Sequence, residues 1–274
     1  MLKLRRYIEV LAFVAVWMAG GWLLHLDANV YLLLGVPLIA IFQLFVRRQP
    51  LQKLLVRDAA SFRLCWIGII VAGLLAVAPA YDLLVVALPK QLWIVALWLM
   101  CSVAGAIFAA FALVHQRAST ARQGLPAFLA AVLIGTGLVS LSALAKHHPI
   151  VLPLPKLLSL LKQFLLYFDV CFMLEEVAFR GALDSHVFEP ESNRKPNDRR
   201  WFSSIFVSAL WGLWHLPTLP LTSAATFVVA ISAVIVVHSL IGVPLSFCWR
   251  ASGTLVLPAA AHALIDAFRN TMLQ

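Results

Sequence analysis

Two adjacent carboxylates, followed by an arginine, lie near the end of a long apolar stretch of this sequence. The stretch reads Phe172-Met-Leu-Glu175-Glu176-Val-Ala-Phe-Arg180-Gly181. A carboxylate at the centre of a membrane helix costs roughly 2.5–3.5 kcal/mol on insertion scales. A chain that keeps two such groups side by side either pairs them or uses them in chemistry.

Helical geometry separates the two glutamates. Residues three or four apart share one face of an α-helix, so the sequence predicts an ion pair between Glu176 and Arg180. Glu175 points about 100° away from Glu176, towards phenylalanine side chains, and has no charge partner in its own helix. A carboxylate without a partner is suited to accept a proton, which is the task of a general base. The alternative is structural: an ion pair that locks the helix, plus a second acid that faces water.

Two further polar pairs lie in later apolar stretches. Trp211-Gly-Leu-Trp-His215 places an indole and an imidazole one helical turn apart, and His262-Ala-Leu-Ile-Asp266 does the same for an imidazole and a carboxylate. Each pair also has a structural interpretation, as a packed histidine or as a local hydrogen bond that satisfies both groups in lipid. The functional interpretation of the second pair is an oriented imidazole that donates a hydrogen bond to a developing oxyanion.

The elements that position these residues are predicted to be membrane helices. Of the 274 residues, 62% are hydrophobic and 12% are charged, whereas soluble domains have about 45–50% apolar and about 25% charged residues. The apolar stretches are about 20 residues long, the length of a helix that spans a bilayer, and they lack the period-two alternation of barrel strands. We therefore predict an all-α fold, a polytopic membrane helix bundle with eight or nine transmembrane helices.

The number of helices depends on the last third of the chain. Residues 201–216 form a short span and residues 222–249 a long one, in which Gly242-Val-Pro244 predicts a kink or a break. The predicted spans are 7–26, 29–46, 60–79, 92–115, 126–146, 157–182, 201–216, 222–249 and 254–270.

The charge distribution predicts the orientation in the membrane. The net charge is +9, but most lysines and arginines lie in the connectors, above all 47–58 and 184–200, so no nucleic-acid partner is implied. A cytoplasmic N-terminus puts most of them on the cytoplasmic side, as the positive-inside rule expects. We predict an integral, multi-pass protein in contact with membrane lipids, in the plasma or inner membrane if bacterial. Four basic residues fall on the other side, namely Lys90, Lys146, Lys156 and Arg269, and two more, Lys162 and Arg180, lie within helices.

The cysteines give no sign of a metal or disulfide framework. All lie within apolar stretches and no C-x-x-C pair occurs, so neither a disulfide nor a zinc–thiolate site is predicted. They are Cys65, Cys101, Cys171 and Cys248.

Together the three polar pairs resemble the CAAX protease and bacteriocin-processing family of intramembrane proteases, also called CPBP or Abi. The family pattern is E-E-x-x-x-R, then F-x-x-x-H, then H-x-x-x-N or H-x-x-x-D, on successive membrane helices. The resemblance covers about residues 160–270. It suggests that 151–274 form a CPBP-like catalytic helix core, and that 1–150 are N-terminal transmembrane helices of unassigned role. The motifs here read Glu175-Glu176-x-x-x-Arg180, Trp211-x-x-x-His215 and His262-x-x-x-Asp266.

The resemblance implies hydrolysis of a peptide bond within the membrane, in a membrane-embedded or lipidated protein substrate. Eukaryotic relatives remove the three residues that follow a prenylated cysteine. Carried over residue by residue, Glu175 and His215 would activate a water molecule. His262 with Asp266 would stabilise the tetrahedral oxyanion.

Three further residues would support the site in the family pattern, namely Glu176, Arg180 and Trp211. Trp211 occupies a position where the family often has phenylalanine. We expect little effect on the site, because an aromatic side chain lines it in either case. Asp266 is a family variant with a chemical consequence, because an ionised aspartate cannot donate to an oxyanion. Asp266 would therefore have to be protonated, or act by orienting His262.

The mechanism implied by the resemblance requires no cofactor. The alternative is one divalent metal ion, with zinc first, held by Glu175, Glu176, His215 and His262. We rank it second because the sequence lacks an H-E-x-x-H motif. Two other functions stay open: a non-catalytic immunity or scaffold membrane protein of the same fold, and a proton-coupled transporter. The absence of inverted repeats counts against the transporter.

The three polar pairs can contact one another only if their side chains lie at the same depth in the membrane. At 1.5 Å per residue, Glu175 lies roughly 10–14 Å from a helix end near residue 183. His215 lies about 21 Å from Trp201 on the same measure. The sequence thus predicts a mismatch that tilt, or a span that begins above Trp201, must remove.

Overall fold

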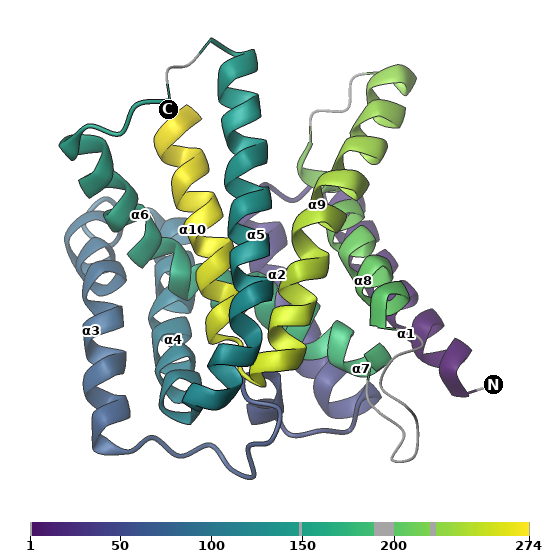
Figure 1. The fold of residues 1–274 in the computed structure, drawn as a ribbon, viewed down its shortest axis with the longest axis horizontal. Helices are drawn as coiled ribbons and strands as arrows, with labels where there is room; N and C mark the ends of the chain where they lie inside the picture. Colours follow the sequence, from purple (N-terminus) through teal and green to yellow (C-terminus); the bar gives the residue numbers. More distant parts are fainter. Residues whose placement is uncertain (1, 148–149, 189–199, 220–222, 274) are drawn as a thin grey trace.

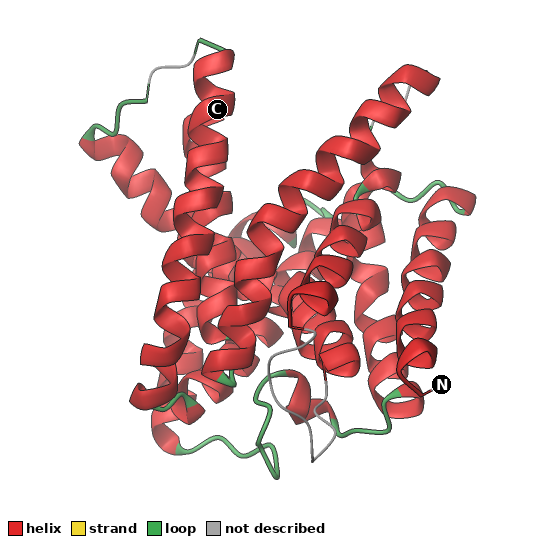
Figure 2. Ribbon diagram, turned by 45° about the vertical axis from the view of Figure 1, so that its right-hand side comes forward, coloured by secondary structure: helices red, strands yellow, loops and turns green. Residues whose placement is uncertain are grey.

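The chain forms a bundle of long helices, and no β-strand occurs among the residues described (Figure 2). A computed structural model describes residues 2–147, 150–188, 200–219 and 223–273. Three basic residues of the connector 184–200, Arg194, Lys195 and Arg199, lie outside the described residues. The predicted all-α fold is confirmed.

The helices follow the predicted spans closely (Figure 1). The first are α1 (Leu2–Leu23), α2 (Ala28–Ile41) with its π-helical continuation η1 (Phe42–Val46), α3 (Trp66–Asp82) with η3 (Leu83–Ala87), α4 (Trp93–His115) and α5 (Ala118–Ala145). The later ones are α6 (Leu154–Cys171), continuing through η4 (Phe172–Asp184) into α7 (Ser185–Phe188), then α8 (Arg200–Trp214), α9 (Ala224–Ser252) and α10 (Val256–Leu273). Two 3₁₀ turns lie in the connections, η2 (Leu51–Leu54) and η5 (Leu216–Thr218).

The lengths and surfaces of these helices are those of a membrane protein. Within the described residues, 7 helical stretches are long and apolar enough to cross a membrane. The shorter α8 and the more polar α10 pack in the same bundle, so the described residues form 9 helical segments, of which 7 meet the length and composition of a membrane span. Large apolar side chains cover the outside, for example Leu74 at 70% and Leu133 at 71% exposure. Hydrocarbon solvates such a surface, so the chain is an integral, multi-pass membrane protein.

The long helix α9 is continuous, so the break considered at Gly242-Val-Pro244 does not occur. The glycine has a packing role instead. A Cβ atom at Gly242 would collide with the side chains of Ser208 on α8 and Arg180 on η4. Its absence lets α9 approach the segment that carries the two glutamates.

The helices that carry the polar pairs pack against one another in the middle of the bundle. In Figure 1 they follow in the order α6, α10, α5, α9 and α8, and each contacts its neighbour in this row. The segment η4 contacts α8, α9 and α10. This arrangement brings the three predicted motifs to one place.

The amino-terminal helices support the end of α8. The indole N–H of Trp17 donates to the backbone carbonyl of Tyr31 at 3.0 Å, and the Tyr31 hydroxyl donates to the carbonyl of Trp214 at 2.8 Å. The Trp17 and Trp214 rings pack edge to face, with centroids 4.9 Å apart. Because His215 directly follows Trp214, the first 150 residues help to position a residue of the candidate site.

A buried ion pair ties the end of η4 to α9. Arg250 donates to Asp184 from Nε at 2.8 Å and from Nη2 at 2.5 Å. The same Nη2 donates to Ser203 Oγ on α8 at 2.9 Å. Three helices are thus joined at one end of the bundle.

Asp184→Ala is expected to destabilise the protein strongly, because it removes the carboxylate from a buried guanidinium. Breaking a buried pair in this way costs about 3–5 kcal/mol. We expect a clearly lower Tm in detergent, followed by circular dichroism. Asp58→Ala, at an exposed aspartate, is the matched control and should keep the wild-type Tm. An unchanged Tm for Asp184→Ala would show that the pair does not stabilise the fold.

Candidate active site

The two glutamates lie on a π-helix, which corrects the expectation of a regular α-helix over 157–182. The π-helical segment η4 covers 13 residues. A π-helix bonds residue i to i+5, so its turns are wider than those of an α-helix, and such segments are frequent at functional sites. Every residue from Glu176 to Asp184 is buried. The motif therefore sits in a helix with unusual geometry and little access to lipid.

Glu175 faces α8. The indole Nε1 of Trp211 donates to Glu175 Oε2 at 2.8 Å, and His215 Nε2 lies 3.9 Å from the same oxygen. His215 donates from Nδ1 to the Trp211 carbonyl at 2.8 Å, which leaves the lone pair on its Nε2. A water molecule can donate to two acceptors at this separation. The side chains of Glu175 and His215 are 15% and 27% exposed, so a small molecule can reach them.

The expected mismatch in depth disappears because the helix carrying Glu175 is longer than predicted. It continues through α7 to Phe188, which places Glu175 at most about 20 Å from that end. His215 lies about 22 Å from the start of α8 at Arg200. The two side chains therefore reach the same level of the bundle.

Glu176 is fully buried and faces the opposite neighbour, α10. Its Oε1 accepts a hydrogen bond from His262 Nδ1 at 2.9 Å and lies 3.4 Å from Arg180 Nη1. The predicted pair of Glu176 with Arg180 is confirmed. His262 is a third member that the sequence did not place there. The adjacent glutamates thus hold groups on two different helices.

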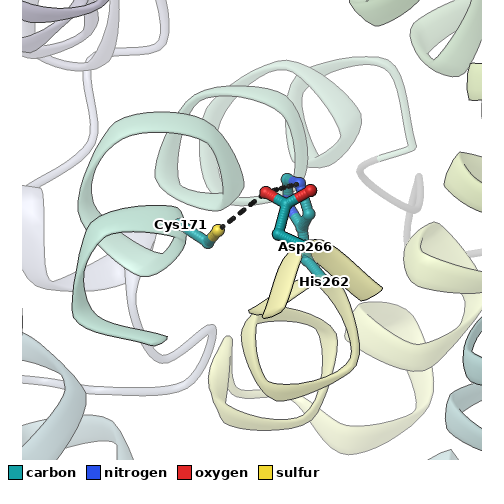
Figure 3. A group of neighbouring side chains, drawn as sticks. All are labelled: Cys171, His262 and Asp266. Atoms are coloured by element: carbon teal, nitrogen blue, oxygen red, sulfur yellow. Dashed lines mark hydrogen bonds and ion pairs between the residues drawn. The ribbon is translucent and has the colours of Figure 1, made fainter. Parts of the chain in front are cut away.

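Asp266 acts as an acceptor in all its contacts. Its Oδ2 lies 3.6 Å from His262 Nε2 and accepts from the Cys171 thiol at 3.7 Å (Figure 3). Its Oδ1 lies 2.9 Å from Arg269 Nη1. Of the two roles left open by the sequence, this pattern favours orientation of His262 over donation to an oxyanion.

Trp211 lies at the centre of the cluster. Its ring packs edge to face against His238 and His262, with centroids 4.6 Å and 5.1 Å away, and the Arg180 guanidinium lies 4.3 Å from the ring centroid. The aromatic wall is therefore present. We expected a tryptophan in place of the family's phenylalanine to have little effect on the site. In one respect the effect is real, because phenylalanine has no N–H that could donate to Glu175.

Trp211→Phe keeps an aromatic ring at this position and loses the N–H that donates to Glu175. A hydrogen bond to a charged group contributes about 1.5–3 kcal/mol, so we expect kcat for proteolysis to fall about 10- to 100-fold with little change in KM. The matched control is Trp214→Phe, because the buried Trp214 Nε1 has no hydrogen-bond partner. Equal losses in the two variants would assign the effect to ring size rather than to the bond with Glu175.

His238 on α9 lies beside His215, although it belongs to none of the three polar pairs in the sequence. Its ring centroid lies 4.3 Å from that of His215, with 36° between the planes. It donates from Nδ1 to the Val234 carbonyl at 2.8 Å, so its Nε2 also keeps a lone pair. The only signal in the sequence was a histidine within an apolar stretch, without a polar neighbour one turn away.

The alternative metal ligands predicted from the sequence do not form one cluster. They form two separate pairs, Glu175 with His215 and Glu176 with His262. Among the residues that the structure describes, no three of these four have their donor atoms within 4.8 Å of one another. These residues do not fit a single metal ion, and no step of the reaction is assigned to a metal held by them.

Comparison with known proteins identifies the part of the chain that contains the site. Residues 157–268 match the model of a family described as Rce1-like, type II CAAX prenyl endopeptidase. No curated protein and no solved structure matches the chain. The matched residues include Glu175, His215 and Asp266. The match confirms, for residues 157–268, the resemblance to the CAAX protease (CPBP, Abi) family seen in the motifs.

Proposed function

We propose that this protein is an intramembrane endopeptidase that hydrolyses a peptide bond in a membrane-associated or lipidated protein. The family match supports a CAAX protease-type endopeptidase at the level of the family. The observation that carries the mechanism is the 3.9 Å separation between Glu175 Oε2 and His215 Nε2. Two proton acceptors at this separation can hold and activate a single water molecule.

Glu175 is the general base in this proposal. It takes a proton from the water as the water oxygen bonds to the carbonyl carbon of the scissile peptide. His215 accepts the second hydrogen of the same water and directs its lone pair. The N–H of Trp211 donates to the Glu175 carboxylate, so the base is already positioned before the reaction begins.

His262 stabilises the oxyanion that forms on the substrate. Glu176 accepts the hydrogen bond from Nδ1 and thereby fixes the ring, and a proton on Nε2 is then available to the oxyanion. Asp266 beside Nε2 orients the imidazole and stabilises its positive charge. The intermediate collapses when the C–N bond breaks, and the proton held by Glu175 passes to the leaving nitrogen. One water is consumed, and the products are a new carboxyl terminus and an amine.

The proposed orientation places the N-terminus in the cytoplasm. The connector between α2 and α3 lies at the opposite end of the bundle from the C-terminus (Figure 1), and it carries Arg47, Arg48, Lys53 and Arg57. Basic residues collect on the cytoplasmic side of membrane proteins. The description of the matched family points to a prenylated C-terminal peptide as the class of substrate.

The proposal is tested by comparing protein termini in membranes from cells that contain the wild-type chain or Glu175→Gln. Mass spectrometry should find a set of membrane-associated or lipidated proteins that is shortened only with the wild-type chain. A reconstituted assay with a farnesylated peptide that ends in C-a-a-X then tests the substrate class. Identical termini in the two membranes would contradict proteolysis and favour the non-catalytic alternative.

A further inference from the structure

A thiol, an imidazole and a carboxylate converge where α6 packs against α10 (Figure 3). Asp266 Oδ2 lies 3.6 Å from His262 Nε2 and 3.7 Å from Cys171 Sγ. The three ligand atoms all lie within 4.8 Å of one another. His262 and Asp266 are one turn apart on α10, and Cys171 faces them from the last turn of α6. All three residues are buried.

The two separations from Asp266 Oδ2, 3.6 Å to His262 Nε2 and 3.7 Å to Cys171 Sγ, match those of ligands around a tetrahedral zinc ion. Zinc binds nitrogen and carboxylate oxygen at about 2.0–2.2 Å and thiolate sulfur at about 2.3 Å. At tetrahedral angles such bond lengths place the ligand atoms roughly 3.3–3.7 Å from one another. We infer that Cys171, His262 and Asp266 form a binding site for one zinc-class transition-metal ion.

The surroundings of the three ligands are those of a metal site. A histidine that binds a metal through one ring nitrogen almost always donates from the other to a carboxylate or carbonyl. His262 does so, because its Nδ1 donates to Glu176 at 2.9 Å and leaves Nε2 facing the cluster. A ligating carboxylate is in turn held by a hydrogen bond, and Arg269 provides this contact to Oδ1 of Asp266 at 2.9 Å.

Charge and donor chemistry select the class of ion. The thiolate of Cys171 and the carboxylate of Asp266 together balance a divalent cation, so the buried unit carries no net charge. The thiol proton leaves to water as the bond between Sγ and the metal forms. Mg²⁺ and Ca²⁺ prefer oxygen ligands, whereas a set of sulfur, nitrogen and oxygen suits zinc and its neighbours. Three protein ligands leave the fourth position open for water or a substrate oxygen.

This site goes beyond the proposed water-activating pair, since neither Glu175 nor His215 belongs to it. It shares His262 and Asp266 with the proposed oxyanion group. A metal ion and a proton cannot occupy His262 Nε2 at the same time. Metal binding therefore replaces the proton that His262 would donate to the oxyanion.

The test is titration of the metal-free, full-length protein in detergent with Co²⁺, which substitutes for zinc and reports its ligands by absorption. We expect one equivalent to bind, with a thiolate-to-metal charge-transfer band that excess Zn²⁺ removes. Cys171→Ala should abolish the band and weaken binding by at least about 100-fold. Glu176→Gln, which alters the partner of His262, should weaken binding about 10- to 100-fold and keep the band.

Two controls assign the signal to this cluster. Cys248→Ala removes another buried thiol and should leave both band and affinity unchanged. Zinc absorption fine structure on the wild-type protein needs no substitution, and should show one sulfur neighbour at about 2.3 Å. Absence of that sulfur, absence of Co²⁺ binding by the folded protein, or a band that persists in Cys171→Ala would overturn the proposal. Glu175→Gln should bind Co²⁺ like the wild type, so failure of the protease proposal is distinguishable from failure of the metal site.

Discussion

Replacing Glu175 with glutamine is expected to lower kcat by about 10²–10⁴-fold, with little change in KM. The amide oxygen can still accept the hydrogen bond from Trp211, but the side chain can no longer take a proton from water. A general base contributes an effect of this size. Single-turnover cleavage by the purified protein in vesicles measures it without interference from product release.

A control in the same helix makes this result specific. Asp169 is a buried acid on α6 whose carboxylate oxygens have no hydrogen-bond partner, and Asp169→Asn makes the same chemical change. We expect its activity to stay close to that of the wild type. If Glu175→Gln kept wild-type activity, or if Asp169→Asn lost as much, Glu175 would not be the base.

His262→Gln is expected to lower kcat by about 10²–10³-fold, the effect of removing one donor from an oxyanion site. Glutamine can still reach towards Glu176, so the fold should survive, which circular dichroism can check. The control is His115→Gln on α4, a histidine outside the site whose Nδ1 donates to the Phe111 carbonyl at 2.8 Å. Unchanged kcat in His262→Gln would remove this residue from the chemistry and leave it only as the partner of Glu176.

Helical spacing in the sequence was sufficient to predict the contacts within each motif. The pair of Glu176 with Arg180 and that of His262 with Asp266 each join residues four apart, so a local rule describes them. The ends of the helices were less predictable. The third span was expected over 60–79, but α3 and η3 cover 66–87, because uniformly apolar sequence sets no sharp boundary.

The contacts between helices could not be predicted, because they depend on packing. Nothing in the spacing shows that η4 is a π-helix, which turns Glu175 towards α8 and Glu176 towards α10. The hydrogen bond from Trp211 to Glu175 joins residues 36 positions apart. Cys171 gave no signal, because the two residues that lie beside it, His262 and Asp266, are on another helix and form no motif with it.

The account rests on Glu175 and His215 acting together on one water molecule, and a double-mutant cycle tests this most directly. The rates to compare are single-turnover cleavage by the wild type, Glu175→Gln, His215→Ala and the double variant. Residues that act as one unit are strongly non-additive, so we predict that the double variant is about as slow as the slower single variant. Losses that multiply in the double variant, or wild-type cleavage by either single variant, would contradict the account.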